Sequence, residues 1–208
     1  FFKNSLFISV VATIGTVISS AVVAYGFARF DFKGKKILFA AMLLSMMLPA
    51  QVLMIPQYLW YQKLGWVGSY LPLIVPYFFA IQGFFVYLMT NFIDGIPKEL
   101  DEAAMVDGAG RMTIMCRILL PVLKPGIVAV SAFTFIGCWN EFLVAFTFIQ
   151  TQRKFTIPVG LKTMIGEYSV NYPALAAGSV IALIPPVILF AIIQKHLVAG
   201  LSAGAVKG

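Results

Sequence analysis

Five long apolar segments constrain this chain more than any other feature. A helix that crosses a bilayer needs about 20 mostly apolar residues. The segments that meet this length are 4–28, 37–60, 71–92, 126–149 and 174–198. Of the 208 residues, 61% are hydrophobic and 11% are charged, whereas soluble domains carry about 25% charged residues. A soluble fold would expose large apolar patches, so the sequence predicts an all-α membrane protein, a polytopic helical bundle of one domain.

Small residues and prolines shape these predicted spans. The first span contains small residues that permit close helix packing in lipid, namely Gly15, Ser19, Ser20, Ala21 and Ala24. Pro49 and Pro56 interrupt the second span, and Pro185-Pro186 lie near the middle of the fifth. We expect a kink or a break at each proline site, serving either as a gating bend or as a static kink.

Lysine and arginine divide unequally between alternate sides of the predicted spans. One side carries ten, namely Arg29, Lys33, Lys35, Lys36, Lys98, Arg111, Arg117, Lys124, Lys195 and Lys207. The other carries five, namely Lys3, Lys63, Arg153, Lys154 and Lys162. Because positive residues concentrate in cytoplasmic loops, the connection between the third and fourth spans and the C-terminus are predicted to be cytoplasmic. Phe1 is then outside, and we expect a further span to precede it.

The connection from 93 to 124 is a charged island between spans. Pro97 suits the first position of a helix. Acidic side chains then fall in or near the first turn, where they favour the helix macrodipole, at Glu99, Asp101 and Glu102. Asp107-Gly108 predicts a turn, and a second short helix is expected over about 112–120, before Pro121. These features alone fit either a docking element or a loop that merely connects two spans.

The spacing within this connection carries a resemblance. Glu102-Ala103-Ala104 is followed after three residues by Gly108, then after nine by Ile118, then after one by Leu120-Pro121. This pattern, E-A-A-x3-G-x9-I-x-L-P, resembles the EAA loop of binding-protein-dependent ABC importers. The resemblance covers essentially the whole chain and lies near the second permease subunit of maltose-type carbohydrate importers. The other matching features are Lys3-Asn4-Ser5, Trp139-Asn140-Glu141 and the ending 197–208.

The resemblance implies a fold and a role for the charged connection. The fold is the transmembrane domain of a type I ABC importer, in which family members have six spans, so the first span is expected to be missing here. The loop 97–121 is then a coupling helix that inserts into a cleft of a cytoplasmic ATPase subunit. Ala103 and Ala104 form the close contact, Gly108 permits the bend, and Glu102 makes a charge-assisted hydrogen bond. The implied coupling set is completed by Asp107, Ile118, Leu120 and Pro121.

The same resemblance implies a set of partners. They are a second permease subunit that forms a heterodimer, two ATPase subunits, an extracytoplasmic substrate-binding protein, membrane lipid and a small-molecule sugar, with no nucleic acid. Loops 61–70 and 150–173 face the binding protein, and the tail 199–208 reaches between the ATPase subunits. No cofactor or metal is expected in this chain. ATP and Mg²⁺ belong to the ATPase subunits, since the sequence contains no G-x-x-x-x-G-K-[ST] pattern.

Polar residues within the predicted spans mark a candidate translocation path. Asn140 and Glu141 lie about 4 Å from the centre of the fourth span at about 1.5 Å per residue, where an ionisable side chain costs about 2.5 kcal/mol or more. Glu141 lines the path, pairs with the partner permease, or lies at headgroup level if the span is misplaced. Tyr77, Gln82 and Tyr87 of the third span offer aromatic faces and hydrogen-bonding groups to a sugar, or pack within the bundle.

The sequence therefore predicts a permease subunit of an ATP-driven importer, for a sugar or oligosaccharide, in a bacterial or archaeal inner membrane. The alternatives are a permease for a non-sugar solute and an ion-coupled transporter, which needs more intramembrane acids than Glu141 and an internal repeat. An intramembrane enzyme is disfavoured, because no H-E-x-x-H, nucleophile elbow or acid pair is present. Cys116 and Cys138 are expected to be inert thiols, and His196 an interface residue.

Overall fold

A computed structural model describes residues 1–166 and 169–205 of the chain, with side chains as far as Gln194. This part is almost entirely helical, and its one β-bridge is an isolated antiparallel pair between Ile165 and Val170. The predicted all-α class is confirmed. The α-helices are α1 Phe2–Arg29, α2 Lys35–Ser45, α3 Ala50–Lys63, α4 Leu71–Ile74, α5 Gly83–Asp94, α6 Glu99–Val106, α7 Arg111–Thr113, α8 Leu120–Val122, α9 Lys124–Trp139, α10 Leu143–Phe148, α11 Ile157–Lys162 and α12 Tyr172–Ala205.

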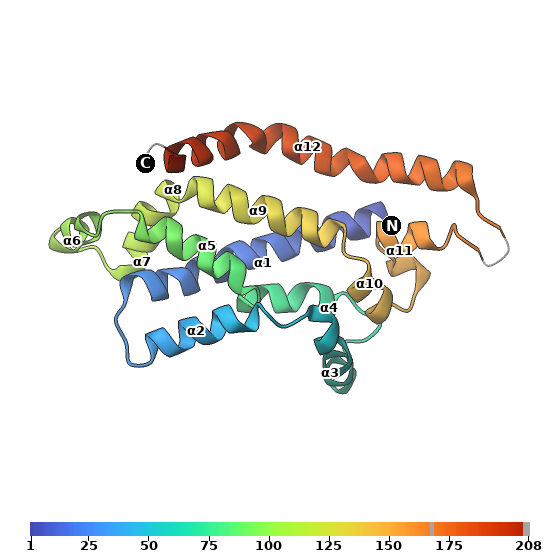
Figure 1. Ribbon diagram of the computed structural model, residues 1–208, viewed down its shortest axis with the longest axis horizontal. Helices are drawn as coiled ribbons and strands as arrows, with labels where there is room; N and C mark the ends of the chain where they lie inside the picture. The colour runs from blue at the N-terminus through green and yellow to red at the C-terminus, as the bar shows by residue number, and fades with distance from the viewer. Residues whose placement is uncertain (167–168, 206–208) are drawn as a thin grey trace.

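Three short helices of other types complete the described chain. Two are 3-10 helices, η1 (Val75–Phe79) and η3 (Gln152–Lys154), and one is a π-helix, η2 (Ile114–Leu119). The helices α1, α5, α9 and α12 run side by side along the long axis (Figure 1). The helices α6 and α7 lie at one end of this bundle, together with the end of α12. The N-terminus, α10 and α11 lie at the other end.

By length and composition, three helical stretches among the described residues can cross a membrane. They are Phe2–Arg29, Leu71–Asp94 and Tyr172–Gln194. Two bent helix pairs raise the number to five if each pair is one span: Lys35–Ser45 with Ala50–Lys63, and Arg111–Val122 with Lys124–Trp139. Within the fourth predicted span, 126–149, α9 ends at Trp139 and α10 begins at Leu143, while the second bent pair begins earlier, at Arg111.

The first helix, α1, is the centre of the bundle and packs against α5 and α9. Its buried face consists mainly of small side chains, as predicted, and includes Ser5, Ser9, Ala12, Gly15, Thr16, Ser20 and Ala24. A Cβ atom added at Gly15 would lie 2.6 Å from the ring of Phe78. Small residues are therefore required where α1 meets its neighbours, because bulkier side chains would force the helices apart.

The N-terminal end of α1 is fastened to the segment that precedes α11. The Asn4 side-chain amide donates to the backbone carbonyls of Arg153 at 2.8 Å and Phe155 at 2.9 Å. The backbone N–H of Ile157 donates to Ser5 Oγ at 2.8 Å. Asn4 and Ser5, noted in the sequence only as part of a family resemblance, thus tie together segments about 150 residues apart.

Three interruptions divide the predicted spans. The break at Pro49 was predicted: α2 and α3 meet there at 100°, whereas Pro56 lies inside α3 without ending it. The breaks at 80–82 and 140–142, which lie inside the predicted spans 71–92 and 126–149, were not predicted. Ala80 has a left-handed φ of 51°, a conformation that no sequence pattern flagged for this alanine.

The expected break at Pro185-Pro186 is also wrong, because α12 is one helix from Tyr172 to Ala205. Pro186 has no N–H, so it cannot donate to the carbonyl of Ala182 four residues earlier. The indole N–H of Trp139 donates to that carbonyl instead, at 3.0 Å. Trp139 is 2% exposed, and this bond joins the end of α9 to the middle of α12. Of the predicted tail 199–208, the backbone to Ala205 continues α12, and the rest lies outside the described residues.

Candidate coupling loop and membrane cavity

The helix α6 carries the acidic end of the predicted coupling loop. Its first turn contains Glu99, Asp101 and Glu102, as predicted. Pro97 lies two residues before the helix and not at its first position, and its carbonyl accepts from the N–H of Leu100. The carbonyl of Lys98 accepts from Asp101 at 3.0 Å and Glu102 at 3.1 Å, closing the first turn.

A glycine in the left-handed conformation ends α6, which confirms the predicted bend. Gly108 has a φ of +82°. The N–H of Ala109 donates to the carbonyl of Ala104 at 2.9 Å, and that of Gly108 donates to Met105 at 3.0 Å. This pair of bonds is the Schellman motif, in which glycine avoids the cost of placing a Cβ at positive φ.

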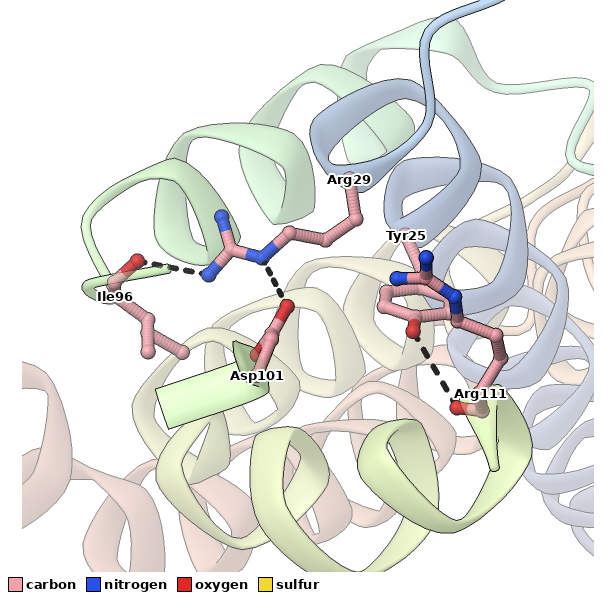
Figure 2. A network of polar contacts seen from close by, with 5 residues as sticks. All are labelled: Tyr25, Arg29, Ile96, Asp101 and Arg111. Atoms are coloured by element: carbon pink, nitrogen blue, oxygen red, sulfur yellow. Dashed lines mark hydrogen bonds and ion pairs between the residues drawn. The ribbon is translucent and has the colours of Figure 1, made fainter. Parts of the chain in front are cut away.

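A buried ion pair fixes α6 to the end of α1. Arg29 Nε donates to Asp101 Oδ2 at 2.7 Å, and Arg29 Nη2 donates to the carbonyl of Ile96 at 2.7 Å. The two side chains are 3% and 5% exposed. Figure 2 shows the guanidinium bridging the turn before α6 and the helix itself. From the sequence, Arg29 was expected only as a topology signal and Asp101 only as a first-turn acid of the helix, and their pairing was not predicted.

A second group of contacts holds the far side of the bend against α1. The Tyr25 hydroxyl donates to the carbonyl of Arg111 at 3.3 Å (Figure 2). The Arg111 guanidinium lies over the ring of Phe30, 5.3 Å from its centroid, and Phe30 packs edge-on against Tyr25 at 5.3 Å. Both arms of the loop therefore rest on the last two turns of α1.

The outward surface of α6 differs from the predicted one. Glu102, Ala103, Asp107 and Gly108 are exposed, whereas Ala104 is 8% exposed and packs in the protein's own core. The prediction that both alanines face an ATPase is therefore wrong for Ala104. Two apolar side chains that the sequence analysis did not select are exposed beside this surface: Val106 at 88% and Met112 at 66%.

The second half of the loop is a continuous helical run from Arg111 to Val122, in which the π-helix η2 replaces regular α-helix. Ile118 and Leu120 are partly buried against the core, so they anchor the loop. Pro121 is exposed and lies inside α8, so the expected end of the helix before Pro121 is wrong. The run meets α9 at 78°.

A cavity of about 260 Å³ lies within the apolar part of the bundle. Three of the five predicted path residues, Tyr77, Gln82 and Glu141, line it together. Gln57 of α3 and Cys138 of α9 also line it. The two unpredicted breaks at 80–82 and 140–142 thus contribute side chains to the same cavity. In a membrane, non-helical backbone is tolerated where it lines a cavity or is buried in protein.

Glu141 caps α10 from the break. Its Oε1 accepts from the backbone N–H of Val144 at 2.8 Å, so the carboxylate lies between two helices and not in the middle of one. Asn140 ends α9 and is exposed, outside the cavity lining. Tyr87 is 39% exposed on α5 and lies near Phe39, with 6.3 Å between ring centroids. The structure therefore separates these two residues from the other three.

Comparison with known proteins gives consistent matches along the chain. Residues 7–203 match the family described as binding-protein-dependent transport system inner membrane component. The chain is 36% identical to an arabinooligosaccharides transport system permease protein of Halalkalibacterium halodurans, over 100% of this chain and 74% of that protein. It is 35% identical to a trehalose/maltose transport system permease protein of Thermococcus litoralis, over 100% and 75%.

A solved structure shares the fold. It is that of a bacterial ABC transporter involved in the import of the acidic polysaccharide alginate. The match has a TM-score of 0.80 at 24% sequence identity and covers 93% of this chain and 73% of the other. At this identity the likeness establishes the architecture, a transmembrane domain of an ABC transporter.

Proposed function

The chain belongs to the family of binding-protein-dependent transport system inner membrane components, and on that premise we propose that it is a permease subunit of an ATP-driven importer for a sugar or oligosaccharide. The observation that carries the proposal is the capped helix α6, which is held to α1 by the Arg29–Asp101 ion pair and faces outward at one end of the bundle. The sugar class rests on the two permease relatives, which are named for arabinooligosaccharides and for trehalose and maltose.

The proposed coupling contact is the exposed side of α6. Glu102, Ala103 and Val106 share this side at helical spacing and are all exposed. The aliphatic pair offers a shallow apolar contact, and the carboxylate offers an acceptor for a basic or backbone donor of an ATPase subunit. Asp107 and Gly108 complete the surface at the bend. Movement of the ATPase then passes to α1 through the Arg29–Asp101 pair.

The proposed translocation path includes the cavity lined by Tyr77, Gln82 and Glu141. An aromatic face with amide and carboxylate groups suits a sugar, which presents apolar C–H faces and hydroxyls. Transporters often form their binding sites from interrupted helices, and two interruptions meet here. The 100° break at Pro49 is the proposed gating bend. Pro56, Pro185 and Pro186 lie inside continuous helices, and for them the static reading is preferred.

The proposed assembly has a second permease, two ATPase subunits that hold ATP and Mg²⁺, and an extracytoplasmic binding protein. The α6 end faces the cytoplasm in this arrangement. Support comes from the excess of lysine and arginine at that end and from the opposite placement of Phe1 (Figure 1). The long exposed apolar side of α12 is available to lipid or to the second permease; it includes Val180, Leu183, Val187 and Phe190.

Reconstituted uptake tests this proposal. The chain, its partner permease and the ATPase subunits are placed in proteoliposomes with the binding protein, and labelled arabino-oligosaccharides, trehalose and maltose are offered. We expect uptake that requires ATP and stops when the ATPase subunits are inactive. ATP turnover with no sugar uptake would favour a non-sugar solute. Uptake driven by an ion gradient without the ATPase subunits would favour the ion-coupled alternative and contradict the coupling role of α6.

A further inference from the structure

A hollow of about 320 Å³ lies at the α6 end of the bundle, apart from the membrane cavity. It is bounded by the last turn of α1, the first turns of α2 and the last turns of α5. The segment that leads into α6 closes it through Lys98. Four segments that are separate in the sequence therefore form a single concave site at one end of the predicted spans.

The hollow collects positive charge. Lys35, Lys36 and Lys98 line it, against one acidic residue, Asp94. Lys35 contacts Asp31 at 3.3 Å, and that carboxylate is 98% exposed. Lys36 and Lys98 form no ion pair with any side chain that the structure describes. The hollow thus has a surplus of cations, of which Lys36 and Lys98 are left unpaired by the described side chains.

Two of these lysines lie at the N-terminus of a helix, and only Lys35 has a carboxylate partner there, Asp31. Lys35 and Lys36 lie in the first turn of α2, which contains no acidic residue and has no side-chain cap. Cations near a helix N-terminus oppose the macrodipole, whereas an anion there is stabilised. An anionic group in the hollow would offset the dipole and the lysine charges together.

The floor of the hollow is apolar and aromatic. Phe27 of α1 packs edge-on against Phe39 of α2, with ring centroids 5.2 Å apart, and both rings line the hollow. The helix α2 buries none of its own residues, so its contact with α1 and α5 leaves this flank open. A ligand that fits must carry a negative head and an apolar continuation.

We propose that this hollow binds the phosphate of an anionic phospholipid headgroup, with an acyl chain over Phe27 and Phe39. Basic pockets between membrane helices are suited to such headgroups. Free inorganic phosphate shares the headgroup chemistry but would leave the aromatic floor unused. An acidic segment of a protein partner would pair with the lysines, but this pairing does not require the segment to enter a hollow between α1, α2 and α5.

The site adjoins the start of the proposed coupling helix. The carbonyl of Lys98 accepts hydrogen bonds from Asp101 and Glu102 in the first turn of α6, while its side chain lines the hollow. Occupation of the hollow therefore fixes the residue from which α6 begins. The lipid site goes beyond the proposed transport function and does not depend on it, since it requires only that the bundle lie in a membrane.

Native mass spectrometry of the purified complex tests the site. Phosphatidylglycerol and phosphatidylcholine with identical acyl chains are titrated separately onto wild type, Lys36→Gln/Lys98→Gln and the control Lys33→Gln. Lys33 lies in the loop just before α2 but outside the hollow lining, so the control loses a charge of equal sign nearby. We expect phosphatidylglycerol affinity to fall about 30-fold in the double variant, from the attraction of two lysines, and to stay within about twofold in the control.

Three results would overturn the proposal. The first is equal phosphatidylglycerol retention in the double variant and wild type. The second is displacement of the bound lipid by inorganic phosphate together with equal binding of the two lipids, which assigns the site to free phosphate. The third is loss of an ATPase subunit with unchanged lipid retention, which assigns the hollow to a protein contact. Lys36→Arg/Lys98→Arg keeps both charges, and retained binding in it excludes misfolding as the cause of loss.

Discussion

The guanidinium of Arg29 and the carboxylate of Asp101 each leave one atom without a partner. Arg29 Nη1 and Asp101 Oδ1 are buried and make no hydrogen bond among the described residues. A buried pair of this kind contributes little net stability over an apolar pair, yet loss of one partner costs about 3–5 kcal/mol because a charge is left buried alone. The pair is therefore better suited to fixing the position of α6 than to stabilising the fold.

Changing one member of this pair should separate ATP hydrolysis from transport. We expect Asp101→Asn to lower the stability of the complex by about 3 kcal/mol and to reduce the sugar moved per ATP hydrolysed. The double change Arg29→Met/Asp101→Leu should recover most of the thermal stability but not the transport ratio. Thermal unfolding and paired ATPase and uptake assays measure both quantities.

The exposed pair of Asp31 and Lys35 provides the comparison for this experiment. Asp31→Asn removes a contact at the surface and should leave the melting temperature and the transport ratio unchanged, because exposed pairs contribute little. A double variant at Arg29 and Asp101 with a wild-type transport ratio would show that the buried pair has no part in coupling.

The left-handed backbone of Gly108 is a second residue-scale constraint. A Cβ at this position meets nothing within 4 Å, so its cost arises from φ alone. We expect Gly108→Val to cost roughly 1–2 kcal/mol or more, to distort the bend and to abolish uptake while membrane insertion is retained.

Gly110 is the matched control for Gly108. It has a φ of −73° and open space around its Cα, so Gly110→Ala should leave uptake near the wild-type rate. Uptake assays on membranes with equal amounts of inserted protein provide the measurement. Normal uptake by the Gly108→Val complex would remove the bend from the coupling mechanism.

Among the elements, α9 and α12 are joined by the indole of Trp139. Trp139→Phe keeps the aromatic packing and removes the donor to the Ala182 carbonyl. We expect a loss of about 1–2 kcal/mol, seen as a lower melting temperature of the purified complex. Trp60→Phe is the control. Trp60 is 61% exposed, so this variant should have the melting temperature of the wild type. An unchanged melting temperature in Trp139→Phe would show that the bond does not hold α12 in place.

Glu141 tests what the break between α9 and α10 does. Glu141→Gln retains an oxygen that can accept from the Val144 N–H but removes the charge, whereas Glu141→Ala removes both. If the charge serves transport, both variants lose uptake, and only Glu141→Ala also loses stability, by about 1 kcal/mol. Wild-type uptake and basal ATPase activity in both variants would exclude Glu141 from the path and from a critical pair.

The sequence predicted features that depend on local chemistry. The turn at Gly108 and the break at Pro49 each follow from a residue with a permissive or restricted backbone, and the acidic start of α6 follows from the helix macrodipole. The breaks at 80–82 and 140–142 follow from tertiary packing around a cavity, and apolar composition does not report them. At Pro185 and Pro186 the sequence predicted a break that does not occur, because a donor from another helix satisfies the carbonyl that Pro186 frees.

In the candidate site too, features set by local sequence were predicted and features set by tertiary packing were not. Spacing selected the candidate coupling loop but could not tell that Ala104 faces inward, since that depends on how α6 lies against the core. It also could not pair Arg29 with Asp101, 72 residues apart. Tyr77, Gln82 and Glu141 were selected as polar residues in apolar segments and do line one cavity, while Tyr87 and Asn140, selected for the same reason, do not.

At the scale of the whole molecule, the cavity should change its accessibility during transport. Cys138 lines the cavity and is 6% exposed. Cys116 is exposed and is replaced by alanine, leaving Cys138 as the labelling site within this chain. We expect a membrane-impermeant thiol reagent to label Cys138 at different rates with and without ATP bound to the complex. Equal rates with and without ATP would place the cavity outside an alternating path.

The bond between Trp139 and Ala182 also bears on biogenesis. Synthesis delivers α9 to the bilayer before α12, so the indole N–H is in place when α12 leaves the insertion machinery. Until α12 reaches that indole, it carries a carbonyl with no donor into hydrocarbon, where an unpaired backbone group costs several kcal/mol. Docking of α12 on α9 removes this penalty, so the nascent chain gains a specific late step that closes the bundle.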